Sequence, residues 1–187
     1  MRKINRNELS IILSNHKFWL ETQFVQGCRA NLSEIDLRKT NLSKLDLTWA
    51  DLRGADLSEA NISEANLSRA DLRYANVSKA NVSRTIFREA GLCGANLSNA
   101  NVREAILSAA DLREANISRA DLSGADLSGA ILYGANISEA GLSRACLCNA
   151  DLRGANLSNA NVREADLRGV DLSATDLRGA DLRGAVR

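Results

Sequence analysis

The chain has no proline, one histidine and only 4% aromatic residues. No apolar run approaches the roughly 18 residues of a membrane-spanning helix, and Ile11–Leu13 is too short for a signal-peptide core. Because His16 is the only histidine, Ser-His-Asp and Cys-His catalytic sets and multi-histidine metal sites are excluded. These absences predict a cytoplasmic protein that is not an enzyme and does not associate with membranes.

An excess of charge of either sign is also missing. The chain has 24 Lys and Arg residues against 23 Asp and Glu residues, for a formal net charge of +1. Such a balance predicts no general attraction to nucleic acid or to an anionic membrane surface. The four cysteines are too sparse for the disulfide framework of a small secreted domain.

The prominent feature of the chain is a strict five-residue repeat. From Leu32 to Leu182 every fifth residue is Leu, Ile, Val or Phe, through 31 positions without an insertion. Two residues before each of these stands a second column, which is Ala in 25 of 31 cases, and Asp or Asn usually lies between the two. Repetition at a fixed period indicates a repeat architecture in which neighbouring units share one core.

A five-residue period suits neither an α-helix nor a flat strand. Side chains repeat about every 3.6 residues in a helix and every second residue in a strand, so a five-residue step would scatter the Leu column around a helix. The pattern fits if the Ala and Leu columns both point inward across a short extended segment and the next two residues turn a corner. Stacked coils of this kind form an all-β solenoid.

The consensus Ala-(Asp/Asn)-Leu-x-x over residues 30–185 resembles the bacterial pentapeptide-repeat family, and the lead-in around His16–Leu20 is similar to that of its cyanobacterial members. The resemblance implies a right-handed quadrilateral β-helix with four repeats per coil. The 31 repeats would then form nearly eight coils, in a rod of roughly 37 Å at about 4.8 Å per coil. We assign residues 1–29 to a capping segment and residues 30–187 to the β-helix.

With four repeats per coil, every twentieth residue lies on the same face. The first face carries an Asp column beside an Arg column, and the second carries Asn beside Ser. At the corners, basic and acidic residues alternate between coils, as in Lys39, Glu59 and Lys79. Alternation avoids the repulsion of stacked like charges, and neutral Asn can stack in ladders. We therefore interpret the charged columns as ladders and not as a binding groove.

Five outward positions depart from this polar rule. Ile86 and Ile106 do so on the fourth face, Ile131 and Tyr133 on the first face, and Trp49 at a corner nearer the N-terminus. Contiguous exposed apolar residues can mark a partner surface, whereas scattered ones are normal. Two interpretations stay open: these five residues bind an unidentified protein partner, or they reflect drift in a tolerant repeat.

A solenoid needs protection at its ends, where backbone groups lack partners. Residues 7–20 predict a capping helix with Asn7 as its N-cap and with His16 packed by Trp19. Bulky residues replace Ala in the first coil and predict an end plug beneath this helix; they are Ile35, Thr40 and Leu45.

The other end carries no capping segment in the sequence. Buried-type leucines continue into the last repeats, at Leu167, Leu172, Leu177 and Leu182. This pattern predicts a homodimer through an open C-terminal coil, although a truncated sequence would look the same.

Two thiols, Cys146 and Cys148, are expected on the same outer face, where they could bind a soft metal ion. Two ligands do not complete a tetrahedral site, and Cys93 falls on a different face, so we predict no metal and no cofactor. The Asp columns lie in no expected cleft, and the glycines lie mostly at corners, so neither an acid–base site nor a phosphate loop is predicted.

The sequence thus favours a non-catalytic structural or interaction scaffold. The resemblance implies an alternative, because one branch of the family mimics duplex DNA and binds DNA gyrase. Such mimicry needs a strongly negative surface, and residues 31–187 carry a net charge of only about −2.

Overall fold

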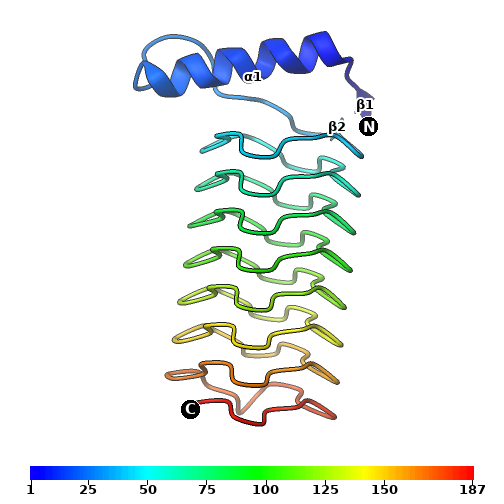
Figure 1. The fold of residues 1–187 in the computed structure, drawn as a ribbon, viewed down its shortest axis with the longest axis vertical. Coiled ribbons are helices and arrows are strands. Elements are labelled where there is room, and N and C mark those ends of the chain that lie inside the picture. Colours follow the sequence, from blue (N-terminus) through cyan, green and yellow to red (C-terminus); the bar gives the residue numbers. More distant parts are fainter.

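The computed structural model describes all 187 residues, Met1–Arg187. Its regular elements are the short strand β1 (Arg2–Lys3), the helix α1 (Arg6–Glu21) and the short strand β2 (Ile35–Asp36), which pairs in parallel with β1. After a connecting loop, the chain from Ala30 onward winds into stacked coils, with α1 lying across one end and the C-terminus at the other (Figure 1). The fold is the predicted right-handed quadrilateral β-helix with a short N-terminal helical cap.

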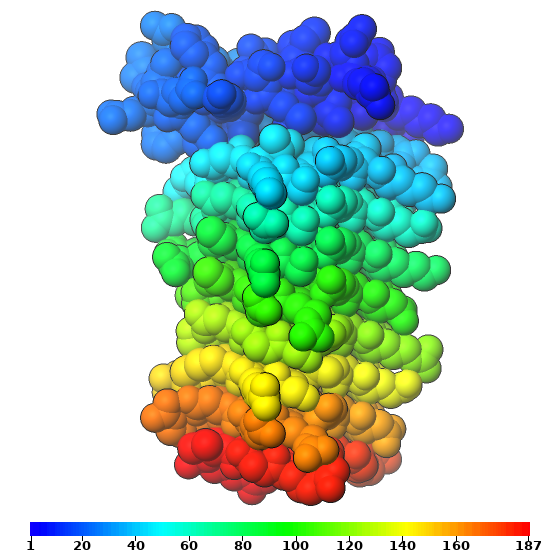
Figure 2. Space-filling model, viewed as in Figure 1, coloured from blue at the N-terminus to red at the C-terminus, as the bar shows by residue number.

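Backbone pairing sets four repeats per coil. Parallel bridges join residues twenty positions apart along the stack, as between Asp51 and Asp71. The N–H of Asp71 donates to the carbonyl of Ala50 at 2.9 Å, and the N–H of Leu52 donates to the carbonyl of Asp71 at 2.8 Å. These bonds run between coils and satisfy backbone groups that have no partner within their own coil. The coils therefore form one continuous column beneath the cap (Figure 2).

Each corner of a coil is a tight turn. The N–H of Ala50 donates to the carbonyl of Leu47 at 2.9 Å, and Trp49, the third residue of this turn, has a φ of +66°. A closing hydrogen bond with a positive φ at the third residue is typical of a type II turn. The same conformation recurs at Lys, Glu and Arg corners throughout the rod. The positive φ strains the backbone of these L-residues, but their side chains can form ion pairs with the corners of neighbouring coils.

The Ala and Leu columns fill the interior as predicted. The core is one cluster of 53 buried residues that extends from Ala30 to Leu167. Phe87 is its largest fully buried side chain, and Thr85 replaces Ala two residues before it. The Thr85 hydroxyl donates to the carbonyl of Ile62 at 2.8 Å, so this buried polar group is satisfied.

Helix α1 begins one residue earlier than the predicted range, and its N-cap is Asn5, not Asn7. The Asn5 side chain accepts a hydrogen bond from the N–H of Glu8 at 2.9 Å, and Glu8 forms an ion pair with Arg2. An acidic residue three positions after a capping residue is typical of a helix start. The prediction of Asn7 was therefore wrong, because Asn7 lies within the first turn.

The cap is joined to the rod through a buried histidine. His16 is 1% exposed, and its Nδ1 accepts a hydrogen bond from the N–H of Ala30 at 3.0 Å. Its ring stacks on Trp19 with 5.6 Å between the ring centroids, as predicted. Burial lowers the pKa of His16 below its ordinary value of 6.5. The ring is therefore neutral when α1 is docked, and it fastens α1 to the start of the first coil.

The last coil is less regular than the others. Asp171 has no bridge to Asp151, although every other outward residue of the first face is paired with the coil before it. Val170 and Thr175 replace Ala on either side of this point, and the Thr175 hydroxyl donates to the carbonyl of Leu152 on the preceding coil at 3.0 Å. Leucines of this coil are only partly buried: Leu172, Leu177 and Leu182. The predicted homodimer through this end stays a prediction.

Candidate interaction surface

Two adjacent faces of the rod carry polar outward residues along their length, with Gly141 as the one exception. On the second face the Asn96 Nδ2 donates to the Asn76 Oδ1 at 3.3 Å, and on the third face the Asn81 Nδ2 donates to the Asn61 Oδ1 at 3.3 Å. Similar bonds run from coil to coil along both faces. Because these side chains bind each other, the predicted Asn ladders are confirmed, and these faces offer little unsatisfied polarity to a partner.

The first face carries ion pairs within single repeats. The Arg153 Nε donates to the Asp151 Oδ1 at 2.8 Å, and its Nη2 donates to the Asp151 Oδ2 at 2.7 Å. These hydrogen bonds lower the pKa of Asp151 to about 2. The same fork, in which two guanidinium nitrogens donate to the two carboxylate oxygens, recurs at Asp51–Arg53, Asp71–Arg73 and Asp111–Arg113. Each of these four carboxylates is paired with the Arg of its own repeat, whereas Asp171 has Ser173 in that position. The Asp column therefore does not create a continuous anionic stripe.

Charged corners pair between coils, as the alternation predicted. The distance from the Arg84 Nε to the Glu104 Oε2 is 2.8 Å, and that from the Arg144 Nε to the Glu164 Oε2 is also 2.8 Å. Further pairs of this kind are Lys39–Glu59, Lys44–Glu64, Arg69–Glu89 and Arg119–Glu139. Exposed pairs contribute little stability individually. Their main effect is to leave few unpaired charges on the rod.

The predicted apolar residues lie on the other two faces and at the corner between them. Ile86 and Ile106 are bridge partners on neighbouring coils of the fourth face, and both are half-buried. Ile131 and Tyr133 lie in one repeat of the first face and are 39% and 51% exposed. The structure therefore forms two apolar pairs, separated along the rod by less than two coils.

A corner without charge connects the two pairs. Ala109 follows Ile106 at the corner between the fourth and first faces, and Gly129 occupies the same corner one coil later. Ile131 then follows Gly129 by two residues. We call this set, consisting of Ile86, Ile106, Ala109, Gly129, Ile131 and Tyr133, the neutral strip. Its two corner residues, Ala109 and Gly129, are uncharged, so no ion pair links this corner to those of the neighbouring coils.

Trp49 does not join the neutral strip. It lies in the first coil, two coils from Ile86, and it is 37% exposed. The guanidinium of Arg69 lies 5.1 Å from the centroid of its ring, in a cation–π contact. Trp49 thus packs with its own corner column, and its predicted role in partner binding stays a prediction.

Tyr74 is an exposed aromatic residue that the sequence reasoning missed. It is 72% exposed at the corner between the first and second faces, and its ring lies over Gly94 on the next coil. The twenty-residue count would have found it, because it places Tyr74 between two glycines, Gly54 and Gly94, in a column of which half the residues are Gly. The exposed aromatic residues of the rod are therefore Trp49, Tyr74 and Tyr133, all on the first face or its corners.

A cluster of possible metal ligands lies on the fourth face. Ligand atoms of Cys146, Cys148 and Asp166 all lie within 4.8 Å of one another. Only the two thiols were expected here; the third group, Asp166, lies twenty residues after Cys146 and is its bridge partner. The neighbouring Cys146 side chain, through hydrogen bonding, raises the pKa of the Cys148 thiol. All four cysteines of the chain are free.

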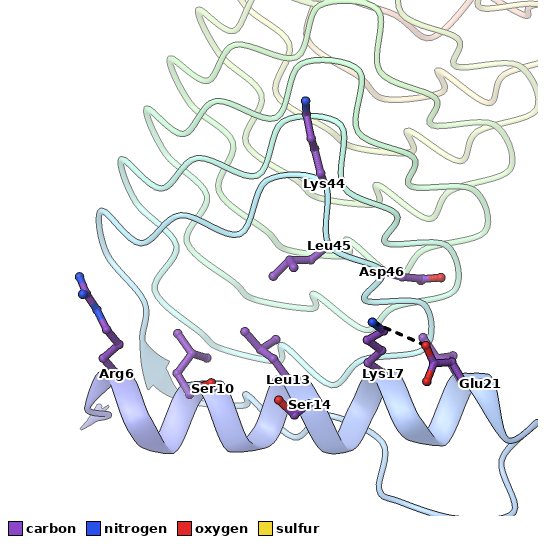
Figure 3. Close-up of a pocket in the computed structure, with 11 residues that line it drawn as sticks. Arg6, Ser10, Leu13, Ser14, Lys17, Glu21, Lys44, Leu45 and Asp46 are labelled. Atoms are coloured by element: carbon purple, nitrogen blue, oxygen red, sulfur yellow. Dashed lines mark ion pairs between the residues drawn. The ribbon is translucent and has the colours of Figure 1, made fainter.

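A cleft of about 650 Å³ separates α1 from the first coil. Figure 3 shows Leu13 and Leu45 facing each other across it, with Lys17 and Glu21 at one side. The Lys17 Nζ lies 3.6 Å from the Glu21 Oε1, so these rim charges pair with each other. Leu45 is one of the predicted bulky residues of the first coil, and it packs against the core beneath the cap. The cleft is thus a gap where the cap and the first coil do not pack closely.

The five-residue repeat shows to which protein family the chain belongs. A family model described as pentapeptide repeats matches residues 28–58, 50–88, 92–129, 115–154 and 150–186. The chain belongs to the pentapeptide-repeat family. As a pentapeptide-repeat protein it is a non-enzymatic repeat scaffold. Its one helix has neither the length nor the apolar run needed to cross a bilayer.

Several solved pentapeptide-repeat structures are similar to this chain. HetL from the cyanobacterium Nostoc, a pentapeptide repeat protein involved in heterocyst differentiation regulation, is 40% identical over 84% of this chain and 81% of HetL, with a TM-score of 0.30. A second Nostoc pentapeptide repeat protein is 30% identical over 61% of this chain and 78% of its own, with a TM-score of 0.40.

A plasmid-mediated fluoroquinolone resistance protein, QnrB1, is 22% identical over 85% of each chain, with a TM-score of 0.45. No curated protein matched in a sequence search. None of these structural superpositions is close enough to carry a functional argument.

Proposed function

We propose that this pentapeptide-repeat protein is a rigid scaffold that binds a protein partner through the neutral strip on its fourth and first faces. The observation that carries this proposal is the one-sided distribution of apolar departures. Ile86, Ile106, Ile131 and Tyr133 lie on two adjacent faces, whereas the second and third faces carry only polar outward residues apart from Gly141. Drift in a tolerant repeat would scatter such residues over all four faces.

The composition of the strip suits a partner interface. Aromatic residues are enriched in interface cores, where charged residues are depleted, and the strip combines Tyr133 with three isoleucines. A rigid rod also loses little conformational entropy when it binds, because its surface is already ordered by the coil-to-coil hydrogen bonds. The partner class is a folded protein with a complementary apolar ridge, and we place the interaction in the cytoplasm of a bacterium.

The repeat provides substitutions that remove the strip without disturbing the fold. Ile131→Asp with Tyr133→Arg recreates the Asp151–Arg153 fork of the next coil, and Ile86→Asn with Ile106→Asp recreates the residues found at Asn66 and Asp126. The fourfold variant should fold as well as the native protein, as judged by far-UV circular dichroism and thermal unfolding.

The test is affinity capture from an extract of the source organism, with bound proteins quantified by mass spectrometry. We expect the native protein to retain a specific partner and the fourfold variant to lose it. The matched control is Ser98→Arg with Ser143→Arg, which adds charge to the second and third faces in columns that already contain Arg38 and Arg163. If the fourfold variant captures the same proteins as the native chain, or if the native chain captures none, the proposal is wrong.

Mimicry of duplex DNA, with binding to DNA gyrase, is the alternative. The charges of this rod argue against it, because Asp51, Asp71, Asp111 and Asp151 of the first face are paired with Arg in the same repeat. Six of the eight corner Glu residues are paired with Lys or Arg, and the exceptions are Glu34 and Glu114. A DNA-like surface needs a dense, unpaired negative charge. Loss of gyrase supercoiling activity in the presence of this protein would favour the alternative.

A further inference from the structure

The repeat fold brings the two outward side chains of one repeat together. In the second coil of the fourth face, the Ser68 hydroxyl donates to the Asn66 Oδ1 at 2.6 Å. Cys146 and Cys148 occupy the same two positions of this face, four coils further along. The backbone that makes the Ser–Asn hydrogen bond therefore places two sulfur atoms side by side.

The next coil supplies a third ligand. Asp166 is the bridge partner of Cys146, and ligand atoms of Cys146, Cys148 and Asp166 lie within 4.8 Å of one another. In a tetrahedral zinc site with Zn–S bonds of about 2.3 Å, two sulfur ligands lie about 3.8 Å apart. The three atoms thus need to move by only about 1 Å toward a shared ion, which is within reach of side-chain rotation.

The surroundings suit a dication bound to two thiolates and a carboxylate. Such a ligand set carries three negative charges, so that the occupied site would retain one. The Arg168 guanidinium lies against Asp166, with 2.6 Å between its Nη2 and the Asp166 Oδ2 and 2.9 Å between its Nε and the Oδ1. It can balance the remaining charge and orient the carboxylate, as outer partners of metal ligands do.

We propose that Cys146, Cys148 and Asp166 bind a soft, thiophilic divalent cation such as Zn²⁺. Both cysteines are half-buried, so the site is open on its outer side and water supplies the fourth ligand. Binding displaces the two thiol protons into solvent, because the thiolate is the ligand form. Hard cations such as Ca²⁺ and Mg²⁺ are excluded, since they prefer an all-oxygen shell.

The test uses the reduced full-length protein and Co²⁺ as a spectroscopic probe for the zinc site. We expect thiolate-to-cobalt charge-transfer absorption that saturates at one Co²⁺ per chain and disappears when Zn²⁺ is added. Cys146→Asn with Cys148→Ser should abolish the absorption while keeping the fold, because it recreates the Asn66–Ser68 pair of the second coil. Asp166→Asn should weaken Zn²⁺ binding at least tenfold in competition with a chromophoric chelator.

The matched control is Cys28→Ser with Cys93→Ser, which removes the other two thiols and should leave binding unchanged. Absence of the absorption in the native protein would overturn the proposal. So would an unchanged signal in Cys146→Asn with Cys148→Ser, or loss of the signal in the control variant. If Asp166→Asn binds Zn²⁺ as tightly as the native chain, the three-ligand site is wrong.

Discussion

At the scale of the residue, each position of the repeat has a separate physical role. In a representative repeat, Ala75 and Val77 are buried, and the Asn76 Oδ1 accepts a hydrogen bond from the N–H of Ser78 at 3.2 Å. Lys79 then takes a φ of +58° at the corner. A side chain at the corner can form an ion pair, but the positive φ strains an L-residue there and does not strain glycine.

This strain predicts the effect of replacing a corner glycine. Gly129 has a φ of +64°, and an added Cβ would meet no atom within 4 Å, so the cost of Gly129→Ala is backbone strain alone. Strain of about 1–2 kcal/mol, reduced by the entropy of an unfolded glycine, should lower the free energy of unfolding by about 0.5–1 kcal/mol. Chemical denaturation measures this change.

The control is the reverse substitution in the same column one coil earlier. Ala109 has a φ of +56°, and Ala109→Gly should raise the free energy of unfolding by a similar amount. Two changes of the same sign would contradict this description of the corner.

At the scale of the element, α1 is held to the rod by few contacts. Ile4, Leu9, Ile12 and Leu13 are only partly buried against the core, and the cleft beside them leaves part of the helix unpacked. His16 is the buried polar contact between α1 and the rod: its Nδ1 accepts from the N–H of Ala30 at the start of the first coil, whereas its buried Nε2 has no partner. The stability of the cap should therefore be lower than that of the coils.

The cap should undock at mildly acidic pH. Burial lowers the pKa of His16, with Asp46 opposing and Arg29 reinforcing this shift, so the undocked state binds a proton more readily than the docked one. The stabilisation is complete above the undocked pKa of about 6.5 and is lost as the pH falls below it. Hydrogen exchange of the α1 amides should accelerate between about pH 7 and pH 5.5, after correction for the intrinsic rate.

His16→Gln serves as the control for this titration. A neutral side chain at this position should remove the pH dependence between these two values, whatever its effect on docking itself. Equal protection of α1 at both pH values in the native protein would contradict this role of His16.

The elements differ in how far the sequence predicts them. The five-residue phase predicts every buried column of the coils, because a single insertion would move apolar side chains to the surface. The start of α1 does not follow from the sequence alone, since Asn5 and Asn7 are both good capping residues and only the side-chain contact of Asn5 with the N–H of Glu8 distinguishes them. The role of Asp166 as a third possible ligand was not predicted, for another reason. Its link to Cys146 depends on a contact between coils, which requires the four-repeat geometry to be applied to each residue.

At the scale of the whole molecule, the rod is a one-dimensional stack. Apart from the bonds that close its turns, each coil forms backbone hydrogen bonds only with the coils directly before and after it, and the core is a single continuous column. Stability should therefore be close to a sum of coil and interface contributions. Nothing in such a stack requires a particular number of coils.

Deletion of one whole coil tests this property. Removal of residues 110–129 preserves the twenty-residue register, so the shortened chain should fold with a similar circular dichroism per residue and a lower Tm. Removal of residues 110–127 shifts the downstream columns out of phase and should unfold part of the rod. Comparable unfolding of both deletion variants would contradict a nearest-neighbour stack.

The central claim is that the neutral strip, and not the polar ladders, contacts a partner. Site-specific photocrosslinking in living cells tests it most directly, with a photoreactive amino acid in place of Tyr133 or Ile106 and, as the comparison, in place of Ser98 or Ser143. We expect a crosslinked partner from the strip positions and none from the second and third faces. Crosslinks of equal yield from all four positions, or only from Ser98 and Ser143, would contradict the claim.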